Sequence, residues 1–89
     1  MMYPYMTLSD ETNIVHSQMH DDGTVKVYIE RPRDGGFDHA ACILPQYDWR
    51  DISGFTSEEM AFFDRFVHNN AHLILEFAQE GGFANAANF

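Results

Sequence analysis

The sequence predicts an α+β fold, in which an antiparallel meander of three strands carries one C-terminal helix on one of its faces. Three features indicate this: strand-like alternation in the first half, turn residues between the alternating segments, and a strong helix start followed by helical periodicity. Residues 3–7 would raise the count to four strands if they add an edge strand. The 89 residues suffice for a single small domain, residues 1–89.

The first two strands are predicted at residues 12–20 and 24–30. In the second, Val25, Val27 and Ile29 alternate with polar or amphipathic residues, which is typical of a half-buried strand. The sequence Asp-Asp-Gly between the two strands is a turn signal, so we expect a hairpin.

The length of this turn determines the register of the hairpin. A two-residue loop would place His16 on the same face as the apolar residues of the second strand, which mixes polar and apolar side chains. A three-residue loop with Gly23 in the left-handed region instead aligns Val15 with Ile29 and sets His16 opposite Tyr28 on the other face. We predict the second register.

A third strand is predicted at residues 37–44, ending at Pro45. Residues 39–44, His-Ala-Ala-Cys-Ile-Leu, are apolar on both faces, so the inward face is ambiguous and a strand covered on both sides is one explanation. Residues 47–55 are interpreted as a loop or short turn that covers one edge of the core.

The helix is predicted at residues 56–80. Thr56 and Glu59 form a capping box, flanked by the two apolar residues of a hydrophobic staple, and Gly81 is a natural C′ residue. Asn70 interrupts the apolar stripe, so a kink or break is plausible there. The residues expected to be mostly buried in the whole fold are Val25, Val27, Ile29, Phe63, Val67, Ile74 and Phe77.

Two similar segments, DGGFDHAA at residues 34–41 and EGGFANAA at residues 80–87, do not indicate a duplication. The first follows a period-two pattern and the second follows a helical one, so the glycines serve as a turn before a strand and as a helix cap. Neither segment has the glycine spacing of a phosphate-binding loop.

Composition argues against several functions. Fourteen Asp and Glu against five Lys and Arg give a formal charge of −9, which disfavours direct binding to nucleic acid or anionic membranes. An acidic surface could meet a basic partner, or simply keep a small protein soluble. Cys42 is the sole cysteine, so neither a disulfide framework nor a thiolate zinc site is expected. No membrane span or signal peptide is evident, and we expect a cytoplasmic protein.

The clearest candidate for chemistry is a row of side chains on the predicted helix: Asp64, His68, His72 and Glu76. Residues four apart share a helix face, and two imidazoles at that spacing can chelate zinc, nickel or copper, with a carboxylate as a third ligand. The same residues would also occur on an ordinary solvated helix face. One face supplies only part of a coordination shell, so a metal would need a further ligand from a neighbouring loop or a second chain.

No arrangement of residues predicts catalysis. His39 and Cys42 are an odd number of positions apart on a strand and point to opposite faces, so they cannot form a nucleophile–base pair. We therefore expect a non-enzymatic interaction or regulatory protein without a cofactor, acting through a protein partner or as a homodimer. Inhibitor-like or antitoxin-like partners fit its size and charge. The alternative is a metal-binding domain that uses His68 and His72.

Overall fold

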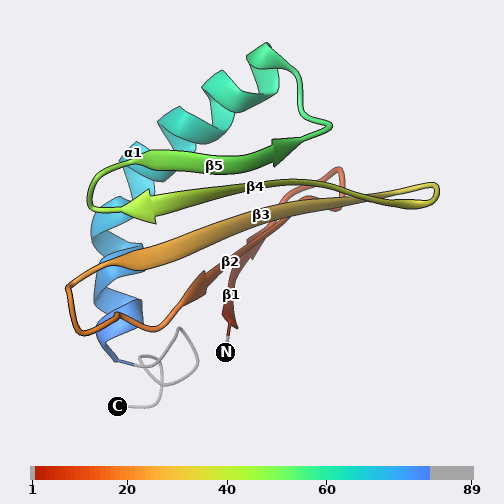
Figure 1. Cartoon of the computed structure of the whole chain (residues 1–89). Helices are drawn as coiled ribbons and strands as arrows, with labels where there is room; N and C mark the ends of the chain where they lie inside the picture. Colours follow the sequence, from red (N-terminus) through yellow and green to blue (C-terminus); the bar gives the residue numbers. More distant parts are fainter. Residues whose placement is uncertain (1, 81–89) are drawn as a thin grey trace.

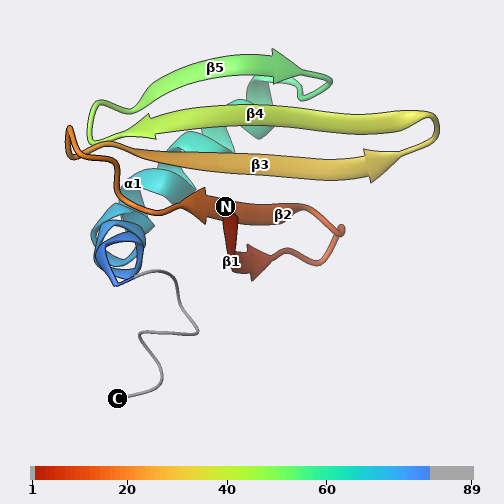
Figure 2. The same ribbon diagram turned by 60° about the horizontal axis from the view of Figure 1, so that its bottom comes forward.

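The computed structural model describes residues 2–80, which form a five-stranded antiparallel sheet with one helix across one face (Figures 1 and 2). The strands follow one another across the sheet in chain order. The α+β class is confirmed, whereas the predicted number of strands, three or four, is too low. The elements are β1 (Met2–Thr7), β2 (Asn13–Ser17), β3 (Val25–Arg33), β4 (Gly36–Leu44), β5 (Asp48–Ser53) and α1 (Ser57–Gln79).

The two strands beyond the predicted meander form the edges of the sheet. β1 is the edge strand that was predicted as conditional, and it pairs with β2. β5 corrects the interpretation of residues 47–55 as a loop. Its residues are mostly polar, so alternation and strand propensity give little signal; pairing with the long strand β4 imposes its extended form. A register shift between His39 and Ala41 and the positive φ of Asp51, 55°, bend this edge.

The register of β2 and β3 differs from the prediction by one residue. Ile14 lies opposite Ile29 and His16 lies opposite Val27, whereas Val15 was expected opposite Ile29. His16 therefore faces the helix and is completely buried, with Nδ1 2.8 Å from the carbonyl oxygen of Ser17.

The turn itself is as predicted, with Gly23 at φ 84°, and the error arises in the residues that precede it. The hydroxyl of Ser17 accepts a hydrogen bond from the backbone N–H of Lys26, so a side chain replaces a carbonyl in the ladder. Beyond it, the N–H of Met19 donates to the carbonyl of Ala78 near the end of α1. The end of β2 thus leaves the sheet and binds the helix. β2 has one more residue than β3 between the turn and the paired residues, and this extra residue shifts the register.

The helix begins as the sequence predicts and runs without a break. Thr56 Oγ1 accepts from the N–H of Glu59, and the Thr56 N–H donates to the Glu59 carboxylate. The helix is continuous through Asn70, and the side-chain amide of Asn70 is hydrogen-bonded within the fold. Asn70 Nδ2 donates to the carbonyl of Phe66, and Oδ1 accepts from the hydroxyl of Tyr5 at 2.7 Å.

The core lies between α1 and the facing side of the sheet. Of the residues expected to be buried, all but Phe77 are buried; Phe77 is half-buried, and its ring lies 6.2 Å from that of Tyr5. Two alanines of α1, Ala71 and Ala78, are also buried in this core. Cys42 is a core residue, as expected. The predicted cap at Gly81 and the second glycine segment beyond residue 80 lie outside the described residues.

Candidate functional site

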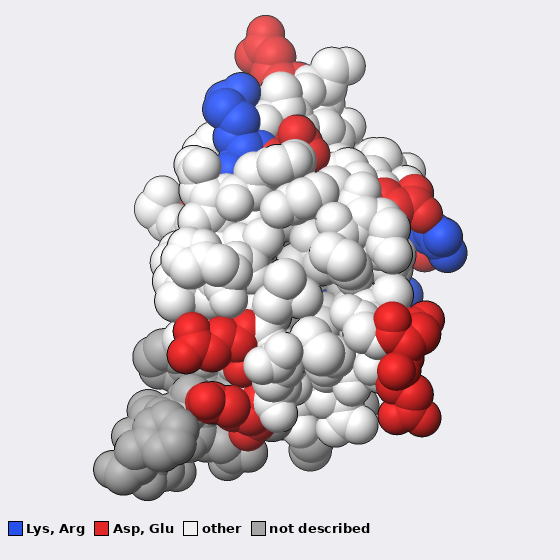
Figure 3. Space-filling view, turned by 90° about the vertical axis from the view of Figure 1, so that its left-hand side faces the viewer, with Lys and Arg blue, Asp and Glu red and all other residues white. Residues whose placement is uncertain are grey.

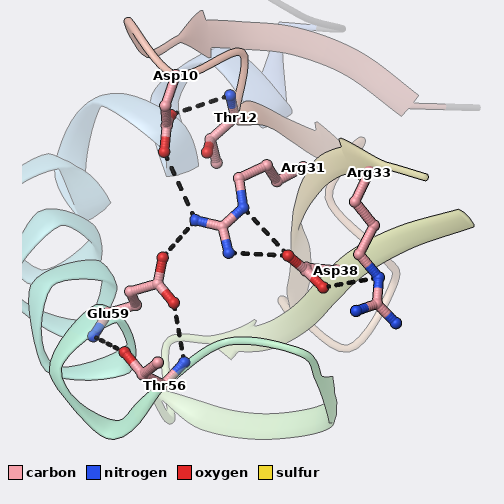
Figure 4. A network of polar contacts seen from close by, with 7 residues as sticks. All are labelled: Asp10, Thr12, Arg31, Arg33, Asp38, Thr56 and Glu59. Atoms are coloured by element: carbon pink, nitrogen blue, oxygen red, sulfur yellow. Dashed lines mark hydrogen bonds and ion pairs between the residues drawn. The ribbon is translucent and has the colours of Figure 1, made fainter.

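A charged network joins four segments at the N-terminal end of α1, with Arg31 at its centre (Figure 4). Arg31 Nη2 and Nε donate to Asp38 Oδ2 at 2.8 and 3.1 Å, and Nη1 pairs with the carboxylate of Glu59. Nη1 also lies 3.6 Å from Asp10 Oδ2. The guanidinium lies 4.9 Å from the centre of the Phe55 ring, a cation–π contact.

This network shifts the pKa values of Asp10, Arg31 and Glu59 in the direction that favours their charged forms. The hydrogen bond from Arg31 is the main cause that lowers the pKa of Glu59 below its usual value, followed by the backbone N–H of Thr56. The pKa of Asp10 is also lowered, chiefly by hydrogen bonding from Thr12, with a smaller contribution from the charge of Arg31. In return, Glu59 and Asp38 raise the pKa of Arg31.

Gly54 allows the network to close. The side chain of Asp38 is only 6% exposed and also contacts Arg33 Nε at 3.2 Å. A Cβ atom on Gly54 would lie 1.9 Å from Asp38 Oδ1, and the φ of Gly54 is 89°. Any other residue would therefore meet both a steric clash and backbone strain at this position.

An open pocket of about 410 Å³ lies beside this network, and we call it the acidic pocket. Apolar side chains form part of its wall, and the ring of Phe62 is 44% exposed. The two acids differ in their contacts: Glu59 is paired with Arg31, whereas the side chain of Glu58 has no hydrogen bond or ion pair within the described residues. The lining residues are Leu8, Ser9, Asp10, Glu58, Glu59, Phe62 and Phe63.

Apolar walls and adjacent carboxylates suit a side chain that is itself part apolar and part cationic. A lysine or arginine stem can pack on Phe62 and Leu8 while its charged end reaches the carboxylates. Sequence reasoning missed this site. Its only local signal was Glu58 and Glu59 followed by Phe62 and Phe63, which the capping box and the core explained without a pocket.

The histidine row is only partly brought together. His68 Nδ1 lies 2.8 Å from the Asp64 carbonyl and 3.6 Å from Asp64 Oδ1, and its ring stacks on Tyr47 at 3.7 Å. Asp64 Oδ1 also accepts a hydrogen bond from the indole of Trp49, at 2.9 Å. Within residues 2–80, no three His, Cys, Asp or Glu side chains gather closely enough to hold a metal ion. His72 and Glu76 are exposed farther along α1.

Cys42 and His39 lie on opposite faces of β4, as predicted. Burial, the main cause, raises the pKa of the Cys42 thiol to about 12, with smaller contributions from Asp64 and Asp48. His39 stacks against Tyr28 on the face away from the helix, with ring centres 6.4 Å apart. A protonated thiol without an adjacent base is a poor nucleophile.

The basic side chains are largely occupied within the chain, which leaves the acids in excess at the surface. Figure 3 shows acidic side chains along the border of one end of the molecule, with few basic ones and an uncharged centre. Lys26 lies over the ring of Tyr28, and Arg50 pairs with Asp48 at 2.7 Å. Arg31 and Arg33 belong to the network around Asp38.

No protein-family model matches this chain, and the searches of curated proteins and of solved structures found no significant match. Among residues 2–80, no helix has the length and apolar character needed to cross a membrane.

Proposed function

We propose that this chain is a non-enzymatic interaction protein that binds a basic segment of a partner protein in the acidic pocket. The observation that carries the proposal is the combination of an exposed aromatic wall with carboxylates at the helix start. Phe62 provides apolar surface, and Glu58 provides a negative charge that no described side chain neutralises.

The charge of the whole chain supports the same kind of partner. With fourteen acids, five bases and most of those bases engaged internally, the surface attracts cationic segments over a distance of about 10 Å at moderate salt. Such attraction mainly increases the association rate, while burial of an apolar stem against the pocket wall slows dissociation. A partner with both basic and apolar side chains fits this chemistry best.

The proposal can be tested with two synthetic peptides, one of alternating Arg and Leu and one with Glu in place of Arg. We expect the Arg–Leu peptide to bind in fluorescence anisotropy, and the Glu–Leu peptide not to bind. Phe62→Ala and Glu58→Gln should each weaken binding about tenfold, because each removes one half of the recognition. Neither residue belongs to the Arg31 network, so folding should persist, as circular dichroism can check.

Asp21→Asn provides the matched control, since it removes one carboxylate charge in the exposed turn between β2 and β3. Binding should remain as in the unmodified protein. Equal weakening by Asp21→Asn and Glu58→Gln would mean that the peptide senses only net charge, and absence of binding at low salt would refute the pocket as a binding site for basic peptides.

The alternative proposal is a metal-binding function through the histidine row. It is supported by the proximity of Asp64 and His68, and it requires ligands from a second chain to complete the coordination shell. Zinc titration of the unmodified protein and of a variant without the two histidines separates the two proposals.

A further inference from the structure

The face of the sheet that points away from α1 has no cover among the described elements. In Figure 2 the five strands lie in front of the helix, and no described segment lies over them. Side chains alternate along β3, so Val25, Val27 and Ile29 face the core while Lys26, Tyr28 and Glu30 face outward. We call this side the outer face.

The registers align outward residues into a row that crosses all five strands: Pro4, Val15, Tyr28, Ala41 and Arg50. Most of this row is apolar or aromatic, and the small central Ala41 is buried between its larger neighbours. Phe37, which is 56% exposed, continues the apolar surface onto the projecting end of the β3–β4 hairpin.

Charges flank the row in a balanced pattern. On one side of it, Lys26 lies on β3, next to Ile43 and Asp48 on β4 and β5. On the other side, Glu30 lies on β3, next to His39. The outer face thus carries two acids and two bases, counting Arg50, in a chain whose formal charge is −9. The charges of the outer face therefore sum to zero, so this surface itself adds no net repulsion between two copies.

This pattern is complementary to itself. Consider two outer faces packed together, with a two-fold axis that lies in the interface and runs parallel to the row. Each strand then lies antiparallel to the same strand of the second copy. Lys26 then lies above Glu30 of the second copy, and Glu30 lies above Lys26 of the second copy, while the two Tyr28 rings meet near the axis. Arg50 lies near Arg50 of the second copy only at the rim of the interface. There, Asp48 of the same chain pairs with it at 2.7 Å.

The edges of the sheet are poor alternatives for self-association. Pro4 removes a backbone donor from β1, and the register shifts between Pro4 and Met6. β5 exposes Asp48, Arg50 and Asp51, and the positive φ of Asp51 distorts the strand. A second sheet therefore approaches the outer face more easily than another strand joins an edge.

We infer that this chain forms a symmetric homodimer through its outer face, with the row around Tyr28 and Ala41 at its centre. Five strands about 4.8 Å apart make a face roughly 24 Å wide, and four to five residues of strand length at about 3.3 Å each give about 300–400 Å² per copy. A standard interface uses about 800 Å² per copy, so the dimer should be weak and depend on protein concentration.

Reciprocal charge variants test this inference. In the Lys26→Glu dimer, the introduced carboxylate would face Glu30 of the second copy, and in the Glu30→Lys dimer the introduced ammonium would face Lys26. Sedimentation equilibrium at low salt should show the unmodified protein dimerising as its concentration rises, and each variant associating at least about tenfold more weakly. An equimolar mixture of the two variants should regain association, because both contacts across the two-fold axis of a mixed dimer then join a lysine with a glutamate.

Arg65→Glu on the exposed side of α1 is the control for net charge, since it makes the same change as Lys26→Glu away from the outer face. It should associate like the unmodified protein. A monomer at millimolar concentration, equal weakening by Arg65→Glu, or a mixture no stronger than either variant alone would each overturn the inference. These results do not bear on the acidic pocket, which lies at the start of α1.

Discussion

The two ends of α1 are attached to the sheet by different physical means. At the N-terminal end, the attachment is ionic: Arg31 on β3 pairs with Glu59 of the first helical turn and with Asp38 of β4. Toward the C-terminal end it is mainly apolar, with Ile74 and Ala78 completely or almost completely buried against the sheet.

This difference locates the polar chemistry of the molecule. Buried aliphatic contacts leave nothing for a ligand to recognise, whereas the ionic end exposes carboxylates next to Phe62 in the acidic pocket. Burial of one acid, Asp38, requires a cation, and the cation then fixes Glu59 and Asp10 around it. The same charges that attach the helix therefore shape the candidate binding site.

The largest effect is expected from breaking the apolar end. Ile74→Ala removes a completely buried side chain and leaves a cavity, so we expect the free energy of unfolding to fall by about 3–4 kcal/mol. Ile74→Val should cost only about 1 kcal/mol. Urea titration followed by circular dichroism measures both. Equal and small losses would show that this end of the helix is not tightly packed.

At the ionic end, Arg31→Ala should lower the free energy of unfolding by about 2–3 kcal/mol. Asp38, 6% exposed, would lose its main partner and remain as a buried charge held only by Arg33. Arg33→Ala is the control, because Arg33 is 61% exposed and should contribute less than about 1 kcal/mol. If the two variants were equally stable, Arg31 would not be the centre of the network.

The same contrast explains how much the sequence reveals. The apolar end was predictable because Phe63, Val67 and Ile74 recur at helical spacing, and the capping box marked the helix start. The network was not predictable, since Arg31 and Glu59 are far apart in the chain and any of five bases could have paired with any of fourteen acids.

Two further features were hidden for related reasons. β5 exists because β4 offers it a hydrogen-bonding edge, and its own residues carry no alternation that would announce a strand. The β2–β3 register depends on Ser17, whose hydroxyl enters the ladder, and on Met19, which bonds to the helix end. Both contacts are tertiary, so turn chemistry alone selected the wrong register.

A smaller effect is expected at the hydrogen bond between Tyr5 and Asn70, which ties β1 to the middle of the helix. Tyr5→Phe and Asn70→Ala should each lower the free energy of unfolding by about 1 kcal/mol. The double variant should lose less than the sum, with a coupling of about 0.5–1 kcal/mol. Thermodynamic cycles from urea titration measure this coupling, and strictly additive losses would contradict a direct bond.

Acid should weaken the ionic end selectively. The pKa of Glu59 is lowered in the folded protein, so its pairing stabilises the fold above the unfolded pKa of about 4.3 and is lost as pH falls through the folded value. The stability difference between the unmodified protein and Arg31→Ala should therefore shrink as pH falls from about 5 toward 3. The stability difference between the unmodified protein and Ile74→Val should stay nearly constant over the same range. A parallel decline of the two stability differences would contradict an ionic attachment at one end of the helix and an apolar attachment at the other.

The smallest effect is expected for metal at the histidine row, which lies between the two ends of the helix. Asp64 already accepts a hydrogen bond from Trp49, and the ring of His68 stacks on Tyr47, so neither side chain is arranged solely for a cation. We expect isothermal titration with zinc to give indistinguishable heats for the unmodified protein and for the His68→Ala/His72→Ala variant. Micromolar or tighter binding that disappears in the variant would instead establish the metal-binding alternative. Such binding should weaken as pH falls through the histidine range, because neutral imidazole is the ligand, and this distinguishes coordination from nonspecific attraction to the acidic surface.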